Sequence, residues 1–98
     1  MKHKWEIRER VDLETLLTGL AEEASELTHA ALKYRRAMFQ KNPTPVGEDE
    51  AYEHLCEEIA DVLLYVDTMD LNLHHISEIE EQKEARWLER LRLCQKKS

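Results

Sequence analysis

The stretch DLETLLTGLAEEASELTHAALKYRRAMF, residues 12–39, decides the fold. Its apolar residues recur at the i, i+3, i+4, i+7 spacing of a helix with one buried stripe, at Leu13, Leu16, Leu17, Leu20, Ala24, Leu27 and Ala31. Asp12 is a suitable N-cap, and the cationic Lys33 and Arg36 near the other end complement the helix dipole. The spacing therefore predicts one long amphipathic helix over 12–39.

Further helices are predicted beyond a break at residues 40–47, QKNPTPVG, where two prolines and a glycine end any helix. One covers about 48–69 and another about 74–93, each with apolar residues at helical spacing. The first ten residues are compatible with a short additional helix. We therefore predict an all-α fold in a single domain, residues 1–98: a helical bundle of three to four helices, with the four-helix core completed by oligomerisation.

The composition excludes several classes of protein. With two Gly and two Pro in 98 residues, the chain lacks the frequent turns of a sandwich or barrel. Apolar runs are only a few residues long, so we expect no membrane span. A formal net charge of −7 argues against binding to a nucleic acid backbone. Because Cys56 and Cys94 match neither a zinc spacing nor a disulfide framework and no signal peptide is recognisable, we expect a cytoplasmic protein.

Two pairs of acidic residues border the faces that the long helices must bury. At about 100° per residue, Glu23-x-x-Glu26 and Glu58-x-x-Asp61 each place two carboxylates at the edge of an apolar stripe. If these helices pack antiparallel, the four carboxylates converge, and like charges there are unfavourable without a cation. Carboxylates without a nearby Cys favour Mg²⁺, or Mn²⁺, over zinc. The alternative is that both pairs are ordinary helix-edge acids in water.

A motif in two halves joins these pairs: EEASE at 22–26 and, beginning 32 positions after Glu26, EIADVLLY at 58–65. It resembles the signature of the MazG-like superfamily of all-α nucleoside triphosphate pyrophosphohydrolases, which is E-E-x-x-E, a spacer and E-x-x-D, often with a tyrosine four residues later. The resemblance covers about residues 5–93. It implies hydrolysis of a (deoxy)nucleoside triphosphate between the α- and β-phosphates, giving a monophosphate and pyrophosphate.

The resemblance also implies a set of site residues. Glu23, Glu26, Glu58 and Asp61 would be the catalytic residues and would hold Mg²⁺. Tyr65 would touch the nucleotide. A carboxylate not fully engaged by metal, Glu26 in preference to Glu23, would accept the proton of the attacking water.

Cationic and aromatic side chains are candidates for holding the anionic substrate. Lys83 falls inside the apolar stripe of the last predicted helix, and it either extends past the core to water or is aimed at a polyanion. Lys33 and Arg36 lie further along the same predicted helix than Glu26, and they suit substrate binding and helix-end charge equally. Trp5 is a candidate for stacking on a base, although large aromatics on amphipathic helices usually anchor a core or an interface.

One chain offers two long helices and a third shorter one, so a four-helix core around the carboxylates requires another copy. We therefore expect a homodimer or a homotetramer, since closed two-fold symmetry is the commonest way to pair identical chains. The rival function belongs to another class, a non-catalytic helical interaction or oligomerisation protein whose acids are merely on the surface. It predicts no metal-dependent activity.

Overall fold

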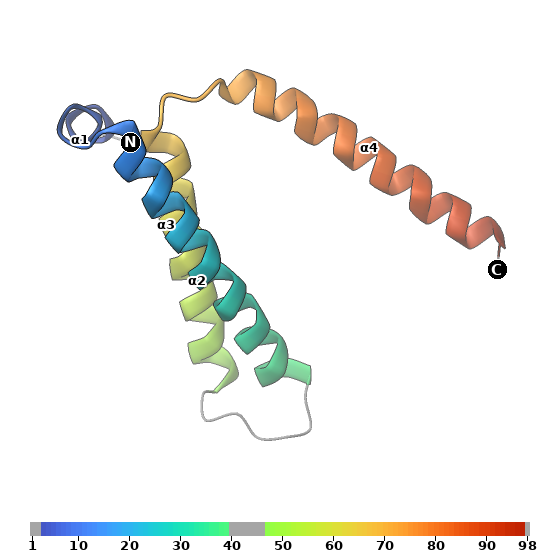
Figure 1. Ribbon diagram of the computed structural model, residues 1–98. Helices are drawn as coiled ribbons and strands as arrows, with labels where there is room; N and C mark the ends of the chain where they lie inside the picture. Colours follow the sequence, from blue (N-terminus) through green and yellow to red (C-terminus); the bar gives the residue numbers. More distant parts are fainter. Residues whose placement is uncertain (1–2, 40–46, 98) are drawn as a thin grey trace.

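The computed structural model describes residues 3–39 and 47–97. Within these residues the chain forms helices and no strand, which confirms the predicted all-α fold (Figure 1). The elements in chain order are α1 (Lys4–Arg10), α2 (Leu13–Phe39), α3 (Glu48–Thr68) and α4 (Leu73–Lys97). None of the described helices combines the length and the hydrophobicity that crossing a bilayer requires.

Side-chain caps define where two of the helices begin. The Asp12 carboxylate accepts a hydrogen bond from the Thr15 backbone N–H at 2.8 Å, so the predicted N-cap is confirmed. Hydrogen bonds from Thr15 hold the pKa of Asp12 below its ordinary value. The Asn72 side chain accepts the His75 N–H at 3.0 Å in the same way, and α4 therefore begins directly after Asn72.

Helices α2 and α3 run antiparallel, side by side, as a hairpin (Figure 1). Its buried apolar side chains among the described residues are few, and two of the four are alanines: Leu16, Ala30, Ala51 and Met69. Gly19 of α2 is also buried, because the ring of Tyr65 on α3 lies where a Cβ of residue 19 would be. The glycine therefore permits a close approach of the two helices that no larger residue would allow without displacing the tyrosine.

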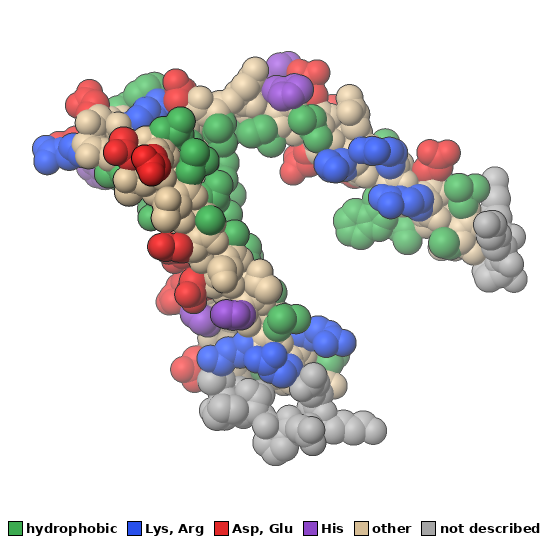
Figure 2. All heavy atoms as spheres, in the orientation of Figure 1, with side chains coloured by type: hydrophobic (Ala, Val, Ile, Leu, Met, Phe, Trp, Pro, Cys, Tyr) green, Lys and Arg blue, Asp and Glu red, His purple; other side chains and the backbone are tan. Residues whose placement is uncertain are grey.

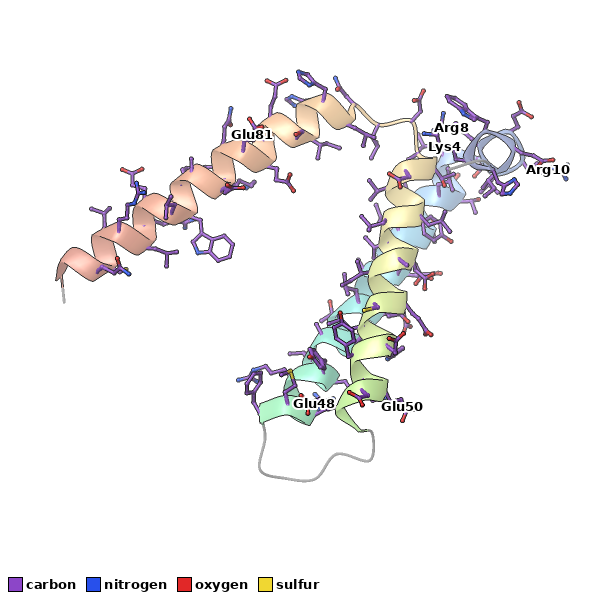
Figure 3. The ribbon with its side chains drawn as sticks, turned by 180° about the vertical axis from the view of Figure 1, so that it is seen from behind. Lys4, Arg8, Arg10, Glu48, Glu50 and Glu81 are labelled. Carbon is purple, nitrogen blue, oxygen red and sulfur yellow. The ribbon has the colours of Figure 1, made fainter. Side chains whose placement is uncertain are left out.

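Arg8 fastens the short helix α1 to the end of α3, and Figure 3 shows it at the opposite end of the hairpin from Glu48 and Glu50. Its Nε donates a hydrogen bond to the Thr68 carbonyl at 2.7 Å, and its guanidinium lies 3.7 Å from the Asp70 carboxylate. The same guanidinium stacks over the Trp5 ring at 4.5 Å. A cation placed on the last carbonyls of a helix also complements the helix dipole.

Helix α4 packs against no other helix in the part of the chain that the structure describes, and it projects away from the hairpin (Figure 1). Its residues 73–95 are all exposed. The large apolar side chains exposed on it are Leu73, Ile76, Ile79, Trp87, Leu88, Leu91 and Leu93. The Cα radius of gyration is 17.8 Å, against about 13 Å for a compact domain of this length. The single chain is therefore extended, with α4 outside the packed part.

Candidate metal centre

Three carboxylates converge where α2 and α3 face each other. Glu23 comes from α2, and Glu58 and Asp61 come from α3. Each offers one oxygen, and these oxygens all lie within 4.8 Å of one another. The antiparallel hairpin brings the two halves of the acidic motif together, as the sequence predicted for the packing of these helices. We refer to Glu23, Glu58 and Asp61 as the carboxylate cluster.

The cluster concentrates negative charge in a partly desolvated place. The pKa of Glu23 is raised above its ordinary value, first by desolvation and then by the negative charges of Asp61 and Glu58. Both effects disfavour the ionised carboxylate. A cation placed among the three groups would reverse this, because an opposite charge favours their ionised forms.

Glu58 is the member of the cluster for which a buried oxygen lacks a partner in the described part of the chain. Its side chain is only 12 % exposed, and its Oε1 lies 3.2 Å from Nε2 of His54. Its Oε2 is buried and has no hydrogen-bond partner among the described residues. A buried carboxylate oxygen without a partner is costly. Oxygen donors without sulfur are the ligand set of Mg²⁺ and Mn²⁺, so the residues present fit a hard divalent cation.

Glu26, the fourth predicted ligand, is not part of this cluster. It lies one helical turn beyond Glu23 on α2 and is exposed to solvent. Glu22 is exposed as well and borders a shallow surface pocket together with Gly19 and Tyr65. The structure therefore brings together three of the four predicted carboxylates and leaves Glu26 at the solvent edge of the same helix.

A cavity of about 290 Å³ lies beside the cluster, between α1, α2 and α3. Its lining combines two acids with aromatic, hydroxyl and aliphatic groups: Glu23, Asp61, Tyr65, Thr15, Thr68, Ile7, Val11, Leu16 and Leu64. Tyr65 is thus placed beside the carboxylates. The contribution of Ile7 and Val11 was missed by sequence reasoning, because nothing in their spacing indicates that α1 folds back onto the end of α3.

The other predicted substrate ligands lie elsewhere in the single chain. Lys33 lines a separate cavity of about 330 Å³ near His54, and Arg36 is exposed. Trp5 is exposed and stacked against Arg8, outside the lining of the cavity beside the carboxylates. Lys83 is exposed on α4, which packs against no other described helix.

His54 is a site neighbour that the sequence analysis did not single out. It stands four residues before Glu58, the spacing at which two side chains on a helix are neighbours. That spacing was a usable signal, because a histidine one turn from an expected metal ligand is well placed to hydrogen-bond to it.

Comparison with known proteins identifies the family. Residues 11–85 match the model of the MazG nucleotide pyrophosphohydrolase domain. The matched segment holds α2, α3, the first half of α4 and all three members of the carboxylate cluster. No curated protein and no solved structure gave a match. The resemblance seen in the acidic motif is confirmed by the family match, and the chain belongs to the MazG nucleotide pyrophosphohydrolase domain family.

Proposed function

We propose that the protein hydrolyses (deoxy)nucleoside triphosphates between the α- and β-phosphates, with Mg²⁺, or Mn²⁺, as cofactor. The products would be a nucleoside monophosphate and pyrophosphate. The observation that carries this proposal is the convergence of Glu23, Glu58 and Asp61 within 4.8 Å, inside the segment that matches the family. The buried, unpartnered Oε2 of Glu58 supports a cation there.

The acids would divide the work of binding and proton transfer. Glu23, Glu58 and Asp61 would hold the cation, and Glu26, at the solvent edge of α2, would be the ligand least engaged by it. A bound Mg²⁺ supplies charge neutralisation for the phosphates and activates water for attack. Because Glu26 lies outside the cluster and is exposed, we assign it as the acceptor of the proton that the attacking water loses.

The cavity beside the cluster would receive the nucleoside. Tyr65 and the aliphatic side chains around it offer a surface for a base or a sugar, while the acids lie on the same lining. Trp5, on the same short helix as Ile7, lies outside the lining of this cavity and against Arg8, and it is our candidate for stacking on a base that extends beyond the cavity. Lys33 and Arg36, from the helix that carries Glu23, are candidates for binding the phosphates.

We further propose that the active form is a homodimer or a homotetramer. Exposed apolar residues occur on both long helices of the hairpin and along α4. In Figure 2, hydrophobic side chains line the side of the hairpin that faces α4, and acidic side chains gather along the opposite edge. A second copy covering the apolar side would leave the carboxylates open to substrate. Lys83 on α4 would then reach substrate only across the boundary between copies.

Residues 1–98 would act as one domain in the cytoplasm, where nucleoside triphosphates are available. Neither a membrane nor a nucleic acid would be a partner.

The test of the proposed function is a panel of ribo- and deoxyribonucleoside triphosphates incubated with the protein and Mg²⁺, with the products separated. We expect pyrophosphate and one monophosphate, and no turnover in chelator. Release of orthophosphate and a diphosphate would contradict the assigned bond. No turnover with any triphosphate would favour the non-catalytic interaction protein.

A further inference from the structure

A histidine contacts the carboxylate cluster from outside it. Nε2 of His54 lies 3.2 Å from Oε1 of Glu58. His54 stands one helical turn before Glu58 on α3. The His54 side chain is 40 % exposed, whereas that of Glu58 is 12 % exposed. The contact therefore joins a ring near the solvent to a carboxylate that is largely buried.

This contact involves one carboxylate oxygen of Glu58, and the other oxygen takes no part in it. Oε1 is paired with the imidazole, while Oε2 is buried without a hydrogen-bond partner among the described residues. A glutamate side chain has several rotatable bonds, and ordering them costs conformational entropy. A hydrogen bond made before the ligand arrives removes part of that cost from the binding step.

We propose that His54 is a positioning residue for the metal site. By donating Nε2–H to Oε1, it holds the Glu58 carboxylate so that Oε2 stays available to a divalent cation. The inference rests on the proposed function, because it assigns the cluster to a metal. Neutral imidazole protonated on Nε2 would suffice to donate across this 3.2 Å contact, so the proposed role does not need a charged histidine.

The chain supplies a matched control for this contact. On α4, Nε2 of His74 lies 3.0 Å from Oε1 of Glu78 at the same i, i+4 spacing. These side chains are 87 % and 55 % exposed, and Glu78 is not a member of the carboxylate cluster. Removing His74 therefore deletes the same kind of contact without touching the site.

The experiment measures Mg²⁺ binding to the full chain by calorimetry without nucleotide, together with the Mg²⁺ concentration that gives half-maximal turnover. We expect His54→Ala to weaken Mg²⁺ binding by about 10–100-fold, the usual effect of losing a partner of a metal ligand. The maximal rate at saturating Mg²⁺ should change much less. His54→Gln, whose amide can donate to the same oxygen, should recover most of the affinity, and His74→Ala should bind as the wild type does.

His54→Ala should keep the helix, because alanine is the best helix former. If this variant binds Mg²⁺ with an affinity within twofold of the wild type, the inference is wrong. This holds even if the variant melts at a lower temperature in chelator, because a change in stability alone does not show a role in metal binding. Glu58→Gln separates this failure from that of the proposed function. If Glu58→Gln loses Mg²⁺ binding and His54→Ala does not, only the role of His54 is wrong. If Glu58→Gln binds Mg²⁺ like the wild type, the cluster is not the metal site and both proposals fall.

Discussion

Helices α3 and α4 are both long and amphipathic, but they lie in opposite surroundings. Helix α3 packs along α2 and carries two members of the carboxylate cluster, whereas α4 packs against no other described helix. The same i, i+4 His–Glu contact occurs in each, with a glutamate 12 % exposed on α3 and 55 % exposed on α4. The same His–Glu spacing therefore gives a partly buried carboxylate only on α3, where a second helix removes water from the glutamate.

The largest effect should follow from removing an acid on α3. Glu58→Gln should lower the rate of pyrophosphate release by more than about 100-fold, because loss of a partner outside the metal shell already costs about 10–100-fold. Glu78→Gln on α4 is the control and should leave the rate unchanged. Circular dichroism should show the same helical content in both variants. An unchanged rate in Glu58→Gln would remove the metal site from α3.

The second effect concerns what covers α4. Light scattering at micromolar protein should give at least a dimer, since the chain leaves its apolar side uncovered. Ile76→Asp should weaken the assembly by more than tenfold, because burying an isoleucine contributes about 1.5–3 kcal/mol. Glu81, also on α4 (Figure 3), provides the control Glu81→Gln. A compact, fully active monomer would contradict the proposed assembly.

A third, smaller effect should follow from filling the contact between α2 and α3. A Cβ at residue 19 would overlap the ring of Tyr65, so Gly19→Ala should destabilise the fold by about 1–3 kcal/mol. For a domain of this size, each kcal/mol lowers the melting temperature by about 4–8 °C. Gly47→Ala is the control, because among the described residues, its chain neighbours aside, no atom lies within 4 Å of a Cβ placed there. Equal melting temperatures for the two variants would show that Tyr65 does not occupy this place.

The smallest effect is a dependence of stability on pH. Desolvation and the charges of Asp61 and Glu58 raise the pKa of Glu23 above its ordinary 4.5. An acid whose pKa is raised by folding stabilises the folded chain when protonated, and this stabilisation is lost as the pH rises through the raised pKa. In chelator, Glu23→Gln should therefore melt above the wild type at pH 7, and the difference should narrow towards pH 4.5. A difference in melting temperature that stays constant between pH 7 and pH 4.5 would contradict this. Glu22→Gln is the control, and its melting temperature should not show this dependence on pH.

Much of the fold could be predicted because it follows from local rules. Apolar spacing placed the long helix at 12–39, one residue earlier than its observed start at Leu13, and the Asp12 cap marked its beginning. The acidic pairs at the edges of the stripes implied convergence, and three of the four carboxylates do converge. Glu26 falls further round the helix, which is why it stays exposed.

What could not be predicted depends on lateral fit between helices. Periodicity indicates that α4 has a face to cover but not which surface covers it, so its separation from the hairpin was not foreseen. The contact between Gly19 and Tyr65 could not be predicted either, because it exists only after α2 and α3 pack. The sequence made Trp5 a candidate for stacking on a base. Its position against Arg8 could not be predicted, because it depends on where α1 folds back.

The most direct measurement compares the melting of the wild type and Asp61→Asn in chelator and in Mg²⁺ at 100 times its Kd. Asp61→Asn should melt higher than the wild type in chelator, because one of three like charges is gone. Mg²⁺ should stabilise the wild type by about 2.7 kcal/mol, and the variant should lose most of this response together with turnover. If both proteins melt at the same temperature with and without Mg²⁺, the carboxylate cluster is not a metal site and the proposed enzyme mechanism is wrong.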